Sequence, residues 1–204
     1  MTFKSVIASL TETGSYRDAL FYHFPGGLRF ELSEGDSPLD QVLTALRKAT
    51  SICADVFPEN STILVHLQRW LQFSGLALRD TLRALEEAGL AIPAEREIWH
   101  EAVDENDISE DGYLVHCAFE VPAAKLQNLL WCALATDFPS LQPNPHCRVY
   151  LVDAANGILV HPYDDRGMDI ICRRPALLKG LYEKHNRYLL DYDRETMDRS
   201  FDPA

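Results

Sequence analysis

The segment from Ile158 to Arg173, ILVHPYDDRGMDIICR, holds a dense group of side chains that could do chemistry. An imidazole and three carboxylates lie within nine residues, at His161, Asp164, Asp165 and Asp169. Hard cations such as Mg²⁺ are held by one or two carboxylates together with water. These four residues are therefore candidate ligands of a metal-dependent hydrolase or phosphotransfer enzyme.

The same segment also fits a structural interpretation. Asp side chains cap the N–H groups of turns, and glycine at Gly167 permits a positive φ. Arg166 would neutralise its acidic neighbours, and a bidentate pair with a carboxylate would fix the loop. Asp164 and Asp165 point in different directions around a tight turn, which disfavours a shared metal. We therefore expect an arginine-braced hairpin that follows a strand ending at Tyr163.

A second segment, DYDRE at residues 191–195, repeats the mixture of acids, tyrosine and arginine. Because an unpaired buried charge is costly, we expect the two segments to meet through ion pairs. The candidate pairs are Arg166 with Asp191 or Asp193, and Arg194 with Asp164, Asp165 or Asp169. The alternative is that residues 191–195 only cap the last helix.

The spacing of the histidines and of the cysteines matches no catalytic or metal-binding motif. His66, His100, His116 and His161 lie on predicted strands beside apolar residues, without the spacing of metal ligands, and we expect structural roles for them. Five cysteines are scattered among apolar residues with no CxxC pair, as buried free thiols are. This use of cysteine favours a cytoplasmic protein, and no cofactor is expected.

Charge and hydropathy narrow the class of partner. The 204 residues include 31 acids and 19 bases, which give a net charge of −12. Nucleic-acid binders carry a basic footprint, so this balance excludes DNA and RNA as expected partners and suits a basic protein, or simply solubility. No apolar run approaches the ~20 residues of a membrane span, and the N-terminal segment lacks the long apolar core of a signal peptide. We expect a monomer, or a homodimer through an open sheet edge.

Hydrophobic periodicity predicts a single α+β domain over residues 21–204, after a lead-in segment at residues 1–20. The predicted strands cover residues 28–32, 62–70, 97–103, 112–121, 147–153, 158–163 and 168–172. The predicted helices cover residues 38–56, 78–88, 122–136 and 175–189, with a short closing helix that begins at Asp193 and buries Met197 and Phe201. Most connections between strands are short, which favours a mainly antiparallel sheet covered by helices over a parallel doubly wound sheet.

Six acids crowd residues 101–111, between two of these predicted strands. The segment lacks the central glycine and terminal glutamate of a calcium-binding loop. We expect a solvated hairpin loop rather than a cation or partner site.

The segments YDDRGMDII and LYEKHNRYLLDYDRETMD resemble the C-terminal signature of a bacterial family described as domain of unknown function 3885. GLRFEL, and WCALATDFPS before CRVYLVDAANGILVHPYDDRGMD, are similar to the upstream parts of that family. The resemblance covers roughly residues 20–201. It implies the domain boundary and a bacterial origin, but it implies no mechanism, since the family carries no settled activity.

Three functions remain open at this point. The sequence favours a non-enzymatic binding protein, for example an immunity-type protein that blocks a toxin domain with an acidic surface. The alternatives are a metal-dependent enzyme that uses Asp164, Asp165, Asp169 and His161, and a structural or regulatory subunit.

Overall fold

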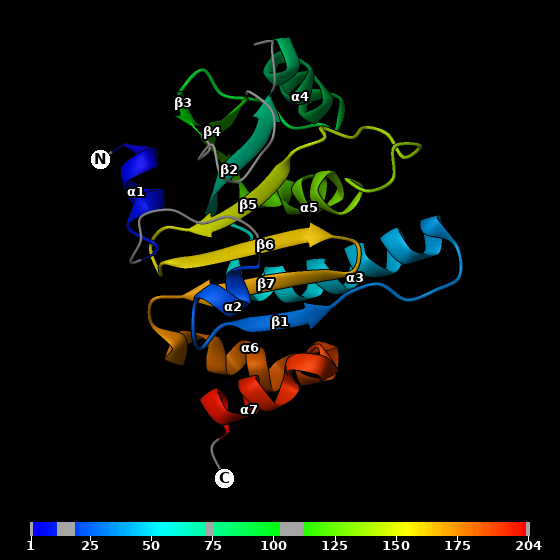
Figure 1. The fold of residues 1–204 in the computed structure, drawn as a ribbon, viewed down its shortest axis with the longest axis vertical. Helices are drawn as coiled ribbons and strands as arrows, with labels where there is room; N and C mark the ends of the chain where they lie inside the picture. The colour runs from blue at the N-terminus through cyan, green and yellow to red at the C-terminus, as the bar shows by residue number, and fades with distance from the viewer. Residues whose placement is uncertain (1, 12–18, 72–75, 103–111, 203–204) are drawn as a thin grey trace.

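The computed structural model describes residues 2–11, 19–71, 76–102 and 112–202 (Figure 1). These residues form one seven-stranded sheet in the order β1-β7-β6-β5-β2-β4-β3, and each pair of neighbours is antiparallel. The strands are β1 (Leu28–Glu31), β2 (Thr62–Leu71), β3 (Arg96–Ala102), β4 (Tyr113–Pro122), β5 (Arg148–Asp153), β6 (Ile158–Asp164) and β7 (Gly167–Cys172). The predicted α+β class with a mainly antiparallel sheet is confirmed, and β5, β6 and β7 form a meander.

The helices are short except for α3. Their bounds are α1 (Phe3–Ala8), α2 (Leu20–His23), α3 (Pro38–Val56), α4 (Leu76–Glu87), α5 (Leu126–Leu134), α6 (Lys179–Lys184) and α7 (Arg194–Phe201). The 3₁₀ turns are η1 (Ala123–Lys125), η2 (Pro175–Leu178), η3 (Asn186–Tyr188) and η4 (Asp191–Asp193). Helix α3 begins as its sequence predicts, because the Ser37 hydroxyl accepts the Asp40 N–H and Pro38 occupies the first helical position.

The sheet carries a large core on one face and a smaller one on the other. Alternate strand residues such as Phe30, Val65 and Leu151 pack against α3 and α5 in the large core. The residues between them, such as Leu64 and Leu159, pack under the first residues of the chain. Figure 1 shows α3 and α5 behind the sheet, α2 in front of β7, and α6 and α7 below β1. Both faces of the sheet therefore exclude water over much of their area.

The predicted helix at residues 175–189 is interrupted in the structure. It consists of η2, α6 and η3, after which the chain extends along the edge strand β1. Leu189 forms an isolated bridge with Phe30, and the Leu190 N–H donates to the Arg29 carbonyl oxygen at 2.9 Å. The chain leaves the helix because these bonds satisfy backbone groups of an edge strand that would otherwise lack partners. The predicted acidic loop lies mostly at residues 103–111, outside the described residues.

Candidate functional site

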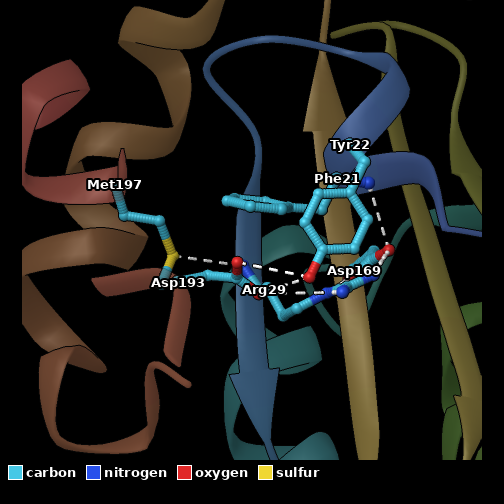
Figure 2. A network of polar contacts seen from close by, with 6 residues as sticks. All are labelled: Phe21, Tyr22, Arg29, Asp169, Asp193 and Met197. Atoms are coloured by element: carbon cyan, nitrogen blue, oxygen red, sulfur yellow. Dashed lines mark hydrogen bonds and ion pairs between the residues drawn. The ribbon is translucent and has the colours of Figure 1, made fainter. Parts of the chain in front are cut away.

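A buried arginine joins the two segments in which the sequence concentrates acids (Figure 2). Arg29 on β1 and Asp169 on β7 are direct partners in the strand register. Arg29 Nε lies 2.7 Å from Asp169 Oδ1 and Arg29 Nη2 lies 2.8 Å from Oδ2, so the pair is bidentate. Asp169 is fully buried, and its Oδ2 also accepts the Phe21 N–H at 3.1 Å.

The same guanidinium reaches the C-terminal tail. Arg29 Nη1 lies 3.7 Å from Asp193 Oδ2, and the Tyr22 hydroxyl donates to the same carboxylate at 3.1 Å. The rings of Tyr22, Phe21 and Tyr163 surround the guanidinium, with centroids 4.4, 5.4 and 5.6 Å from its central carbon. Burial opposes the charge, but hydrogen bonds to Asp169 and its charge raise the pKa of Arg29 above its ordinary value. The Arg29 cluster thus ties α2, the β1–β7 edge and η4 together.

The two acidic segments do not pair with each other as expected: β1 lies between them, and Arg29 contacts one acid of each. Arg166 lies at the tip of the β6–β7 hairpin, where its Nε donates to Asp164 Oδ2 at 2.9 Å and its Nη2 lies 3.6 Å from Asp137. Arg166 is thus paired with Asp164 and Asp137, and not with Asp191 or Asp193.

Arg194 does not reach the hairpin acids either. It folds back on the preceding turns, where it donates to the Asn186 carbonyl and side-chain oxygens and to the Leu189 carbonyl oxygen. Its only carboxylate contact among the described residues is Asp191, at 3.4 Å on the exposed surface. Helix α7 begins after Asp193 as predicted, yet the Asp193 side chain makes no cap hydrogen bond and faces Arg29 instead.

The hairpin tip is braced locally. Asp164 accepts both the Arg166 N–H, at 2.8 Å, and the Arg166 guanidinium. Burial, followed by the neighbouring charge of Asp164, raises the pKa of the Asp165 carboxyl. The predicted positive φ at Gly167 is wrong, because the described left-handed glycines lie elsewhere. Gly167 is required for space, since a Cβ there would overlap the Tyr163 hydroxyl and lie 2.9 Å from the Phe30 carbonyl oxygen.

A row of stacked rings crosses the sheet on the face opposite α3. In order, the rings belong to Trp99, His116, His66, Tyr150 and His161, and successive centroids are 4.8, 5.2, 5.6 and 4.1 Å apart. We call these five residues the ring band. His66 Nε2 and His116 Nδ1 are 2.9 Å apart, so one of the two nitrogens donates to the other.

Burial keeps the histidines of the ring band uncharged. Burial, assisted by the charges of Arg148 and Arg29, lowers the pKa of His161 to about 3. Burial also lowers the pKa of His66 far below its ordinary value, and it lowers the pKa of His116 although Glu101 opposes the shift. His161 Nδ1 is buried without a hydrogen-bond partner. His100 lies on the same strand as Trp99 but is exposed and outside the band.

Three of the four candidate metal ligands are engaged in other contacts. Asp169 holds Arg29, Asp164 holds Arg166, and His161 stacks on Tyr150. Among the described residues, no three His, Cys, Asp or Glu side chains are grouped as ligands of a metal ion would be.

Sequence reasoning missed Arg29, Tyr22 and most of the ring band. The alternation of residues 28–32 places Arg29 opposite Leu28 and Phe30, on the face of a half-buried strand that is expected to meet solvent. The role of Arg29 could have been predicted from the excess of acids in residues 158–173 and 191–195. Buried acids in these segments need a cation from elsewhere in the chain.

A comparison with protein families identifies the family of the chain. The model of a family described as a domain of unknown function, DUF3885, matches residues 7–193. The chain belongs to this family. No curated protein and no solved structure matched the chain. Of the helices in the described residues, none combines the length and apolar character needed to cross a membrane.

Proposed function

We propose that this protein is a non-enzymatic binding protein whose partner is a basic protein. The exposed surface at the start of α3 supports this proposal most directly. Leu39 and Leu43, four residues apart on the helix, are 51% and 49% exposed. Figure 1 shows the first turns of α3 extending beyond the ends of β6 and β7. The two leucines therefore stand where a partner can approach them.

Acidic residues lie close to this apolar pair in the sequence, although one of them, Glu34, pairs with Lys48 at 2.7 Å. Glu34, Asp36 and Asp40 are exposed, and the sequence from Glu31 to Leu43 contains four acids and no base. We call the residues from Glu31 to Leu43 the α3 start. Protein interfaces combine an apolar centre with a charged rim, and complementary charge accelerates association with the correct partner. An apolar pair within an acidic rim suits a partner with basic residues around an apolar site.

The arrangement of the hairpin acids also supports a binding role over catalysis. Asp164 and Asp169 are engaged by arginines, and these contacts stabilise the fold. The free cysteines, four of five buried, fit a reducing compartment, so we place the interaction in the cytoplasm. The specific form that we propose is an immunity-type protein that blocks a basic toxin domain.

Affinity capture from a lysate of the source cells tests the proposal. The wild-type protein is expected to retain a basic protein at low salt and to lose it in 0.5 M NaCl, because screening weakens charge steering. Leu39→Ser combined with Leu43→Ser, and separately Asp36→Lys, should each abolish retention. Asp80→Lys, at an exposed position on α4, is the matched control and should retain the partner.

Two results would contradict this function. Retention that is equal for the wild type and the α3 variants would show that the α3 start is not the binding surface. Retention of only acidic proteins, insensitive to salt, would show that the partner chemistry is wrong. Circular dichroism of each variant establishes that the fold is unchanged.

A further inference from the structure

A cavity of about 460 Å³ lies where β7 ends, between that strand, the turn after α2 and the chain after α1. Its volume falls in the range of sites that hold small molecules. Leu10, Phe24, Pro25, Ile171 and Pro175 supply apolar walls, so an apolar molecule would be sheltered from water on several sides.

The turn that follows α2 is built to form one wall of this cavity. Gly26 has φ +80°, a conformation that glycine adopts without strain, and a Cβ there would lie 3.0 Å from Pro175. A Cβ at Gly27 would lie 3.0 Å from Ile171 Cγ2. The glycine pair thus allows close contact with two residues that line the cavity. The wall is formed by packed backbone and exists before any ligand binds.

One cationic side chain, that of Arg173, lines the same cavity. Arg173 Nη1 donates to the Ser9 carbonyl oxygen at 2.8 Å, which holds the guanidinium at the cavity. His23 also lines the cavity and is exposed. No carboxylate in the described part of the chain pairs with Arg173, although the protein has a net charge of −12.

The sequence around the cavity is locally basic. From Ile170 to Tyr182 it contains three bases and no acid. An arginine that pairs with no carboxylate among the described residues can bind an anion, and its planar donors match a carboxylate or a phosphate. The cavity therefore combines apolar walls with the guanidinium of Arg173, in a protein whose net charge is negative.

We propose that this cavity binds a small anion with an apolar body, such as an aromatic carboxylate. The carboxylate contacts Arg173, and the apolar body lies against Phe24 and Ile171. The site lies apart from the α3 start and does not depend on the partner proposed there.

Cys172 is one of the residues that line the cavity and provides a reporter at its edge, where its Sγ also contacts the Asn156 carbonyl oxygen at 3.6 Å. Of the five free cysteines it alone is not buried, and its Sγ accepts the Arg174 N–H at 3.4 Å. The protein is treated with iodoacetamide in the presence of 1-naphthoate or of the uncharged 1-naphthamide, and the modification of Cys172 is followed by mass spectrometry. We expect naphthoate to slow the modification several-fold and naphthamide at the same concentration to leave it nearly unchanged.

Charge variants assign the effect to the guanidinium. Arg173→Gln retains a donor for the Ser9 carbonyl but loses the charge, and it should abolish protection by naphthoate. Arg79→Gln, at an exposed position on α4, removes the same charge elsewhere and should retain protection. Equilibrium dialysis of naphthoate against each protein repeats the comparison without cysteine chemistry. Equal protection by the acid and the amide, absence of protection and binding, or full binding by Arg173→Gln would each overturn the proposal.

Discussion

At the scale of single residues, the Arg29 cluster shows how a buried charge is tolerated. Arg29 is 8% exposed and Asp169 is 0% exposed, so each ion has lost most of its hydration. The bidentate contact, the Phe21 N–H and three aromatic rings replace the water. Such a pair adds little compared with an apolar pair of equal size, but removal of one partner is costly.

Asp169→Asn is expected to destabilise the protein by about 3–5 kcal/mol, because it leaves the Arg29 charge buried beside a neutral side chain. Asp191→Asn is the matched control, since the exposed Asp191 carboxylate pairs with Arg194 at 3.4 Å on the surface, and we expect little change. Urea unfolding followed by circular dichroism measures both. A loss below about 1 kcal/mol for Asp169→Asn would show that Arg29 finds another partner or water.

Gly167→Ala is expected to destabilise the hairpin by about 1–3 kcal/mol, because the added methyl group overlaps the Tyr163 side chain. Tyr163→Ala removes that side chain. The double variant should therefore be more stable than the sum of the two single losses predicts. The free energy of unfolding is measured for the wild type, the two single variants and the double variant, which form a double-mutant cycle. Strictly additive losses would show that Tyr163 does not crowd Gly167.

At the scale of elements, the two faces of the sheet are both buried, but they are covered by different kinds of side chain. The ring band lies on the face opposite α3. The α3 face is filled by aliphatic and aromatic residues, whereas the other face buries three histidines and a tyrosine. Stacking of flat rings across neighbouring strands fills this face, where cross-strand neighbours lie close enough for direct contact. The histidines must stay neutral for this packing, which links the stability of the sheet to pH.

The free energy of unfolding should fall as pH drops from about 6.5 towards 3. His161 has a pKa of about 3 in the folded protein and an ordinary value of 6.5 when unfolded. Between these values the unfolded chain binds a proton that the folded protein excludes, so stability is complete above pH 6.5 and declines below it. Each such histidine contributes a slope of at most about 1.4 kcal/mol per pH unit.

His161→Gln tests this linkage, because it removes the titrating group. Urea unfolding at pH 7, 6, 5 and 4 should give a shallower decline for His161→Gln than for the wild type. His100→Gln replaces an exposed histidine and should leave the decline as it is. If both variants decline as steeply as the wild type, His161 is protonated in the folded protein and lies closer to water than its burial indicates.

At the scale of the whole molecule, the net charge of −12 acts on stability as well as on partners. Excess charge of one sign repels itself and opposes the compact state. Salt screens charges at the surface over a distance of about 10 Å at 0.1 M, but it hardly reaches a buried pair. Surface repulsion and the Arg29 cluster should therefore respond differently to ionic strength.

The melting temperature is expected to rise by several degrees between 10 and 200 mM NaCl, as screening relieves surface repulsion. The difference in stability between the wild type and Asp169→Asn should stay constant over the same range, since the pair is buried. Thermal unfolding followed by circular dichroism at several salt concentrations measures both quantities. A difference that shrinks with salt would show that water and ions reach Arg29.

Local patterns in the sequence predicted the strands and the start of α3. Short runs of apolar residues located β5, β6 and β7, and Ser37-Pro38 located the first turn of α3, because both signals act between residues close in the chain. The YDDRG turn was predicted as a brace for the same reason, since Asp164 and Arg166 are two residues apart.

The tertiary structure decided which charge pairs with which. Alternation predicts that Arg29 faces away from the α3 core, but it cannot predict that α2 and η4 cover that face. Only the strand register sets Arg29 opposite Asp169, and only the turn of the tail along β1 brings Asp193 within 3.7 Å. Each of these contacts joins residues more than a hundred positions apart in the chain. The path of the chain between the two residues therefore sets their distance, and the local sequence pattern does not.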